Sequence, residues 1–239
     1  MPKRPFIRKQ KKKRHGANFW DHEYQNPAHL ALSTAPSEDF LKFIRFLERH
    51  QPHLLAPDGA VLDLGCGNGR HLVPLATTHQ MPVYGIDIST AAIKQAREVL
   101  PPSAQLFVRS LADPLPAPDQ SCHLVLDLMS SHFLLARGRE KLRQEISRVL
   151  RPGGFLLLKT FLLDDDLHSR RLLAEHPGPE PGTYIHPTIG VPEYVTDEET
   201  LLQTLAPSFT VERVYRSHKH RFRGRARKRR TITIYARMN

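Results

Sequence analysis

One carboxylate and three alternating glycines form the stretch of the chain best suited to binding a ligand. Asp63 is followed at every second position by Gly65, Gly67 and Gly69, and Asp87 ends the next apolar run. Glycine allows the backbone to approach a ligand closely, and a carboxylate at the end of the following strand is typical of one that binds ribose hydroxyls. This spacing predicts a site for a nucleoside compound.

The place of the first carboxylate indicates which nucleoside compound would bind. The order of residues differs from the GxGxxG turn, which holds a pyrophosphate at a helix N-terminus. The Asp63 carboxylate would repel a phosphate, but it would attract an ammonium group. S-adenosylmethionine (SAM) has no phosphate and carries an amino-acid group. The residues therefore favour SAM as the ligand.

The apolar pattern around this stretch predicts the elements that position it. Residues 61–64 and 83–86 indicate buried strands, and residues 71–76 indicate a helix between them. Strand, glycine turn and helix is the typical start of a doubly wound α/β sheet. The same patterns predict further strands over 105–109, 123–128, 155–161, 209–216 and 231–236, and helices over 37–50, 89–100, 139–150 and 196–205.

Two helix signals near these elements are specific enough to be tested. The RPGG stretch at 151–154 is expected to end the helix that begins at Arg139. Thr196 and Glu199 have the spacing of a capping box and are expected to begin the last helix.

Two of these segments resemble motifs of a known family. LDLGCGNGR (62–70) resembles the first motif of the class I SAM-dependent methyltransferases, and GIDIS (85–89) resembles their second. The resemblance implies an α/β fold with a doubly wound, mostly parallel seven-stranded sheet whose last strand is antiparallel, the Rossmann-like methyltransferase fold. It also implies SAM as cofactor. The implied cofactor contacts are Asp63, Gly65, Cys66, Gly67, Asn68, Gly69, Asp87, Ile88, Ser110, Leu111 and Asp127, with Ser110 standing where the family has an acid.

Candidate catalytic residues follow the fourth and fifth strands, because the carboxyl ends of parallel strands form the chemical edge of such a sheet. Asp127 and Lys159 resemble the middle two members of the K-D-K-E set of enzymes that methylate ribose in ribosomal RNA. DLMSSHFLL also resembles the loop of small-molecule methyltransferases, in which His132 would act as a base. The N/D-P-P-Y/F/W motif of exocyclic-amine methyltransferases is absent after the fourth strand. The acceptor atom stays open.

The charge of the chain is concentrated in two places. The formal net charge is +11, yet residues 1–15 hold eight Lys/Arg and residues 213–230 hold ten, with no acid in either stretch. The rest of the chain is net acidic, so the basic stretches indicate a polyanionic partner met at defined places. The basic connection 217–230 joins the last two strands, and the resemblance implies that it lies beside the active site. Its expected RNA contacts are Arg221, Arg223, Arg225, Arg227 and Arg229.

The rest of the chain suggests two appendages to one domain. Residues 1–16 are expected to be a disordered basic arm, because like charges repel and little is apolar. Residues 17–239 would then form the methyltransferase domain. Within it, residues 162–195 are rich in Pro, Gly and His and lack periodicity, which favours a lid over the substrate. Tyr184, His186 and Tyr194 are its candidate substrate contacts, and the aromatic stretch 17–26 is either an anchor for the arm or a flap over the site.

Composition excludes several other classes. No apolar run approaches the ~20 residues of a membrane span, and the N-terminal charges are not followed by the apolar core of a secretory signal. The two cysteines, Cys66 and Cys122, form no metal pattern and no disulfide framework. We therefore expect no metal and no membrane partner, and a reducing, cytoplasmic location. The oligomeric state stays open.

These observations favour a SAM-dependent methyltransferase that acts on RNA, either ribosomal or transfer RNA. A small-molecule or protein methyltransferase of the same fold is the first alternative, because only the charge points to RNA. A SAM-binding RNA or ribosome-assembly factor with little catalysis is the second.

Overall fold

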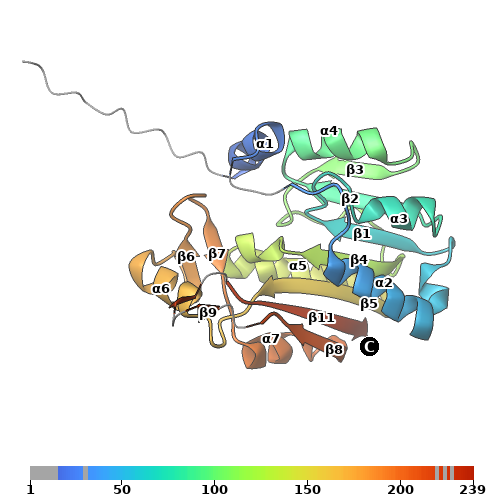
Figure 1. The fold of residues 1–239 in the computed structure, drawn as a ribbon. Coiled ribbons are helices and arrows are strands. Elements are labelled where there is room, and N and C mark those ends of the chain that lie inside the picture. The colour runs from blue at the N-terminus through green and yellow to red at the C-terminus, as the bar shows by residue number, and fades with distance from the viewer. Residues whose placement is uncertain (1–15, 29–31, 219–220, 223–224, 227–228) are drawn as a thin grey trace, which may run out of the picture.

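A seven-stranded sheet forms the centre of the computed structural model, which describes residues 16–28, 32–218, 221–222, 225–226 and 229–239. The strand order is β3-β2-β1-β4-β5-β11-β8 (Figure 1). β11 runs antiparallel to both of its neighbours, and the other pairs are parallel. This confirms the predicted fold class. The strands are β1 (Ala60–Leu64), β2 (Val83–Asp87), β3 (Gln105–Val108), β4 (Cys122–Leu128), β5 (Leu150–Phe161), β8 (Phe209–Arg216) and β11 (Thr231–Met238).

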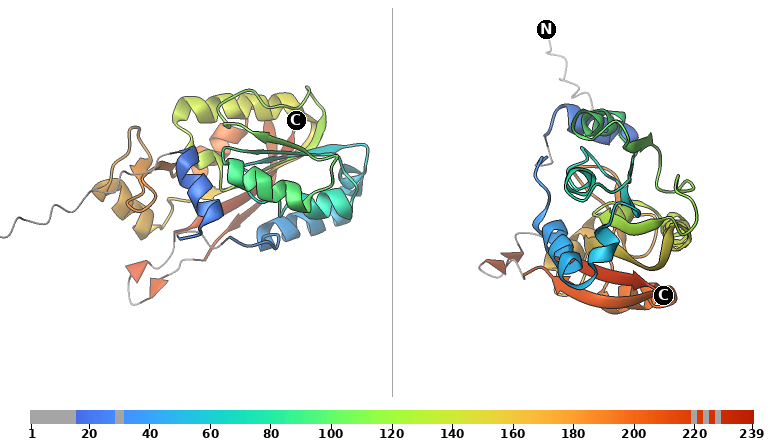
Figure 2. Two further views of the ribbon diagram at one scale, coloured as in Figure 1. Left: turned by 90° about the horizontal axis from the view of Figure 1, so that it is seen from above. Right: turned by 90° about the vertical axis from the view of Figure 1, so that its right-hand side faces the viewer.

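Helices cover both faces of this sheet. α2 (Glu38–His50), α3 (Leu72–Thr77) and α4 (Thr90–Val99) pack their apolar residues on one face. α5 (Ala136–Val149) and α7 (Glu198–Leu205) pack on the other. Figure 2 shows the sheet between these two layers. The short 3₁₀ turns η1 (Pro52–Leu55) and η2 (Ser131–Phe133) follow α2 and β4.

The two-residue period of the strands decides which layer each functional side chain joins. In β4, Leu126 packs in the layer of α2 to α4, whereas Val125 packs in the layer of α5 and α7. Successive side chains of a strand point to opposite faces. Asp127 therefore shares the face of Val125, and Lys159 shares the face of Leu157.

Two of the predicted element ends are wrong. The RPGG stretch does not separate a helix from a strand: β5 already begins at Leu150, which pairs with Cys122 directly after α5. The capping residue of α7 is Asp197 and not Thr196. The Asp197 carboxylate accepts a hydrogen bond from the Thr200 backbone N–H at 2.7 Å, which satisfies one of the free donors of the first turn.

The segment expected to be a loop without periodicity contains short elements. It holds α6 (Leu167–Glu175), β6 (Thr183–Ile185) and β7 (Pro192–Tyr194), and β6 pairs antiparallel with β7. Asp166 caps α6 through the backbone N–H groups of His168 and Ser169. A small apolar cluster of Phe161, Leu172, Tyr184 and Val195 holds the segment against the end of β5. Three-residue strands are too short to produce a recognisable sequence period.

The aromatic and basic stretches are also described in part. α1 (Ala17–Gln25) lies beside α4 (Figure 1). The short strands β9 (Arg221–Phe222) and β10 (Arg225–Ala226) pair with each other and stand apart from the sheet (Figure 2). Residues 1–15 lie outside the described part of the chain. Within that part, none of the helices combines the length and apolar character needed to span a bilayer.

Candidate active site

The glycine turn between β1 and α3 has the backbone geometry that its sequence requires. Gly65, Gly67 and Gly69 have φ angles of 72°, 56° and 78°, which side chains other than glycine rarely adopt. The Gly67 N–H donates to Asp87 Oδ2 at 2.9 Å, and the Ser89 N–H donates to Asp87 Oδ1 at 2.8 Å. Asp87 thus fixes the turn and the start of α4 at the carboxyl edge of the sheet.

A cavity of about 540 Å³ lies over this turn. Most of the cofactor contacts implied by the family resemblance line it, from the glycine turn, from the end of β2 and from the loop after β3. These residues are Gly65, Cys66, Gly67, Asn68, Asp87, Ile88, Ser110 and Leu111. Asp63, Gly69 and Asp127 do not belong to its wall. We refer to this space as the cofactor cavity.

Asp63 lies directly beneath the turn and is suited to a cationic ligand. It is buried, and its Oδ2 has no hydrogen-bond partner among the described residues. Burial, followed by the nearby charges of Asp87 and Asp127, raises the pKa of Asp63 to about 8. The neighbouring His71 does not compensate this charge, because burial lowers its pKa to about 3 and keeps the ring neutral. An ammonium group would stabilise the carboxylate, so the residues present fit SAM.

We expect SAM binding at pH 6.5 to release about one proton per site. The Asp63 carboxyl, whose pKa is raised to about 8, is protonated in the free protein at this pH, and a bound ammonium favours its ionised form. Calorimetry in two buffers of different ionisation enthalpy measures the release. Asp63→Asn should abolish the release and weaken binding, whereas the exposed control Asp58→Asn should keep both. Equal heats in both buffers for the wild type would contradict this assignment.

The aromatic stretch near the N-terminus makes contacts that suit both an anchor for the arm and a flap over the site. Asp21 accepts hydrogen bonds from Ser89 Oγ at 2.7 Å and from the Ala91 N–H at 3.0 Å, which ties α1 to the start of α4. Trp20 and Tyr24 of the same helix line the cofactor cavity. Asp21 therefore anchors α1, and the two aromatic residues form part of the cavity wall.

The far end of the cofactor cavity is rich in aromatic rings. Phe133 makes an edge contact with Trp20 at 4.9 Å between ring centroids, and His132 lies 4.1 Å from Phe133 and 4.8 Å from Phe161. The Arg229 guanidinium lies 3.6 Å over the ring of Phe161. These residues all line the cavity. They form an acceptor end that can hold a flat group by stacking.

A buried carboxylate lies at the same end. Glu193 of β7 accepts a hydrogen bond from the Tyr184 hydroxyl at 2.6 Å and pairs with Arg229. Its second oxygen, Oε1, has no partner among the described residues, although the side chain is buried. A polar atom buried without a partner costs free energy. A ligand that donates a hydrogen bond would satisfy it.

His132 has the properties of a neutral base. Burial and the charge of Arg229 lower the pKa of its ring to about 3. Neither ring nitrogen has a hydrogen-bond partner among the described residues. The ring lines the cofactor cavity and also a second cavity on the other side of η2. Its unpaired nitrogens can therefore form a hydrogen bond with a group placed at the acceptor end.

The other two catalytic candidates lie elsewhere. Asp127 lines the second cavity and not the cofactor cavity, and its Oδ1 accepts a hydrogen bond from the Ser131 N–H at 3.1 Å. Burial raises the pKa of Asp127 above its usual range. Lys159 pairs with Asp39 of α2 and borders neither cavity. This separation follows from the strand faces described above.

The predicted substrate contacts are also divided by the fold. Of these residues, Arg229 lines the cofactor cavity, and Tyr194 lines the second cavity. Tyr184 is fully buried beneath Glu193, and His186 Nδ1 accepts from the N–H groups of Thr188 and Ile189 inside its own turn. The side chains of Arg221, Arg223, Arg225 and Arg227 lie outside the described part of the molecule.

Several cavity residues had no signal in the sequence. Glu193 lies in a three-residue strand, and nothing in its neighbourhood distinguishes it from a surface acid. Phe161 has the appearance of an ordinary core residue. Ser130 of the loop after β4 also lines the cavity, and a Cβ at Gly65 would lie 2.2 Å from its hydroxyl oxygen. Among the described residues, no group of His, Cys, Asp or Glu is arranged to hold a metal ion.

Comparisons with known proteins agree with this geometry. A family model described as a methyltransferase domain matches residues 61–154. Over 143 residues the chain is 36% identical to phthiotriol/phenolphthiotriol dimycocerosates methyltransferase 1 of Mycobacterium ulcerans, covering 58% of this chain and 50% of that protein. It is 29% identical over 110 residues to tRNA N(3)-cytidine methyltransferase METTL2 of Gallus gallus, covering 42% and 30%. A SAM-dependent methyltransferase structure from Methanosarcina mazei superposes with a TM-score of 0.63 at 24% identity, covering 78% and 95%.

The sheet has the Rossmann-like methyltransferase fold, residues 61–154 match a methyltransferase domain, and the residues of the cavity fit SAM as cofactor. The chain spans about half, or less, of the length of the curated relatives it matches. These relatives include methyltransferases of small molecules and of transfer RNA.

Proposed function

We propose that this protein transfers the methyl group of SAM to RNA. The observation that carries the proposal is the position of Arg229. It belongs to the basic connection 217–230, and its guanidinium lines the acceptor end of the cofactor cavity over Phe161. The segment best suited to phosphate contacts is therefore continuous with the acceptor end. The likeness to transfer-RNA methyltransferases supports the same substrate class.

The acceptor end is suited to a nucleobase taken out of its stack. The rings of Trp20, Phe133 and Phe161 offer faces and edges for stacking, as proteins use for unstacked RNA bases. The free Oε1 of Glu193 would accept a hydrogen bond from an exocyclic amino group. We therefore favour a base that carries an amino group. Glu193 would hold the base through this amino group, and the methyl group would go to a different atom.

The residues of the cavity would have separate roles in the reaction. SAM, held by Asp63, Asp87 and the glycine turn, supplies an electrophilic methyl group. Glu193 and the aromatic rings orient the acceptor. This alignment of the reacting atoms contributes to the rate of the reaction. His132 accepts the acceptor's proton where one is released. Ile189, Val191 and Pro192 of the segment 162–195 contribute apolar groups to the cavity wall.

The proposal predicts a change in salt dependence when the basic connection is neutralised. We expect replacement of Arg221, Arg223, Arg225 and Arg227 by Ser to leave SAM affinity intact and to abolish RNA methylation. The slope of log affinity against log salt should shrink by roughly 0.7–0.9 for each phosphate that the variant no longer binds. Arg229 is kept, because its removal would leave the buried Glu193 charge uncompensated.

The matched control removes the same number of positive charges from exposed positions of α2 and α4, namely Lys42, Arg45, Arg49 and Lys94. RNA affinity is measured at several salt concentrations, and methylated nucleosides are identified by mass spectrometry after incubation with total RNA. Equal slopes for the wild type and both variants would contradict the RNA proposal.

A small-molecule acceptor is the second candidate, favoured by the enclosed aromatic wall and by small-molecule methyltransferases among the relatives. It predicts that turnover on a metabolite extract survives neutralisation of the basic connection.

A cytoplasmic location is part of our proposal. It is supported by Cys66 and Cys122, which are both buried and unpaired as thiols.

A further inference from the structure

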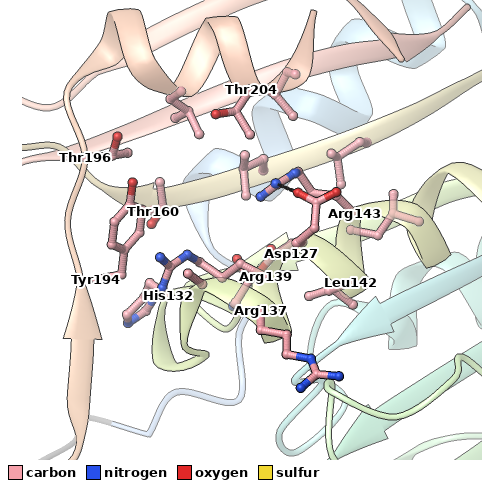
Figure 3. Close-up of a pocket in the computed structure, with 18 residues that line it drawn as sticks. Asp127, His132, Arg137, Arg139, Leu142, Arg143, Thr160, Tyr194, Thr196 and Thr204 are labelled. Carbon is pink, nitrogen blue, oxygen red and sulfur yellow. Dashed lines mark hydrogen bonds and ion pairs between the residues drawn. The ribbon is translucent and has the colours of Figure 1, made fainter. Parts of the chain in front are cut away.

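A second cavity lies on the face of the sheet that α5 and α7 cover. It has a volume of about 450 Å³ and is enclosed by α5, β5 and α7, with η2 at one end (Figure 3). Its volume lies within the range of small-molecule sites. It meets the cofactor cavity at His132, which lines both. The proposed methylation of RNA does not use this space.

The body of the second cavity is aliphatic. Leucine and isoleucine side chains from α5, β5 and α7 form its walls: Leu142, Ile146, Leu156, Leu158, Leu201 and Leu205. The aromatic rings of the wall, those of Tyr194 and His132, lie at one end of the cavity. Flexible aliphatic walls suit an aliphatic chain better than a flat ring system, which would need stacking partners.

One end of the cavity is polar. Figure 3 shows Tyr194, Thr160, Thr196 and His132 gathered at this end. His132 has two buried ring nitrogens without partners among the described residues. A buried polar group without a partner is costly, so a ligand with a polar head would relieve this end.

The polar end carries a buried cation, and the Asp127 carboxyl also lines the cavity, where burial raises its pKa and favours its neutral form. The Arg139 guanidinium lies 3.6 Å from the centroid of the Tyr194 ring and donates to the Leu134 carbonyl at 2.5 Å. Among the described residues, Glu180 is the carboxylate paired with it, at 4.0 Å, and Glu180 also accepts from the Ala136 N–H. The Arg139 side chain is only 14% exposed. At the other end, Arg143 is already paired with Glu140. Arg139 is therefore a buried cation with incomplete compensation.

We propose that the second cavity binds a medium-chain aliphatic carboxylate, with its carboxylate on Arg139 beside His132 and Thr160 and its chain between the leucines of α5, β5 and α7. The site would adjoin the cofactor cavity through His132. It is independent of the RNA substrate proposed above.

The test uses the full-length protein and decanoate as probe, with decan-1-ol and decyltrimethylammonium as charge controls. Leu201→Trp should fill the cavity and abolish decanoate binding, whereas Leu202→Trp, at the next position of α7 and outside the cavity wall, should not. Arg139→Met should weaken decanoate binding roughly 10- to 100-fold, as expected for a charged hydrogen bond, and should leave decan-1-ol binding unchanged. Arg143→Met is its matched control on the same helix.

Calorimetry measures the affinities, and the melting temperature and SAM affinity report whether each variant is folded. If the Leu201→Trp variant does not fold, the decanoate affinities of Arg139→Met and Arg143→Met test the proposal by themselves. Absence of decanoate binding to the wild type at about 1 mM overturns the proposal. Equal affinity for decyltrimethylammonium, or equal decanoate affinities in the Arg139 and Arg143 variants, also overturns it. Conversion of decanoate to its methyl ester would support the site and count against RNA as the acceptor.

Discussion

Replacement of His132 by alanine should lower kcat by about 10²-fold, the low end of the usual contribution of a positioned general base, because its lowered pKa makes the ring a weak base. The ring is buried, both nitrogens lack partners among the described residues, and it lines the acceptor end of the cofactor cavity. SAM affinity should change little, because the residues that we propose to hold the cofactor are the glycine turn, Asp63 and Asp87. Single-turnover rates and SAM calorimetry measure the two effects separately.

The pH profile distinguishes a catalytic role of His132 from a structural one. Its pKa is lowered to about 3, so the free ring stays neutral throughout the range of pH 5 to 8. The wild-type kcat should therefore not fall as the pH is lowered through 6.5. A histidine with an ordinary pKa would cause such a fall. The control is His123→Asn, a buried histidine of β4 outside both cavities, which should affect stability but not kcat. Normal turnover of His132→Ala would show that positioning alone carries the reaction.

Replacement of Gly67 by alanine should weaken SAM binding roughly 10- to 100-fold. A Cβ at this position would lie 2.3 Å from the Tyr24 hydroxyl oxygen, and the φ angle of 56° is itself unfavourable for alanine. The turn would have to move, and the hydrogen bond from the Gly67 N–H to Asp87 would break. Calorimetry with SAM measures the change in affinity.

Two further variants separate the crowding from the backbone strain. Gly153 also has a left-handed φ of 78°, but nothing lies within 4 Å of a Cβ there, so Gly153→Ala should destabilise the fold without affecting SAM affinity. Tyr24→Phe in the Gly67→Ala background removes the closest atom and leaves the next at 3.2 Å. We expect it to recover part of the SAM affinity. Equal affinities in Gly67→Ala and the wild type would mean that Tyr24 moves aside freely.

The location of the proposed cofactor site follows from the sequence, because its determinants are local. The order of Asp63, the glycines and Asp87 specifies a tight turn at the end of one strand and a carboxylate at the end of the next. Parallel neighbours in one sheet then bring these residues to the same edge. The structure places Gly65, Gly67 and Asp87 in the wall of a single cavity, as the spacing requires.

The role of the residues after β4 and β5 could not be assigned in the same way. Asp127, His132 and Lys159 all lie near the carboxyl ends of neighbouring strands, but the sheet distributes them over two faces. Asp127 lies on the same face of the sheet as Val125, which α5 and α7 cover. Lys159 lies on the same face as Leu157, which α2 covers. The alternation is visible in the sequence, but which helices cover each face is decided by packing.

The sequence by itself determined the fold class, the cofactor turn and the basic connection, because each depends on short-range spacing or composition. Only the tertiary structure decided the acceptor end. Glu193, Phe161 and Arg229 come from a short strand, the end of a core strand and the end of a basic stretch, and no local pattern relates them. They meet because the segment 162–195 folds back over the end of β5, where burial of Phe161, Leu172, Tyr184 and Val195 stabilises it.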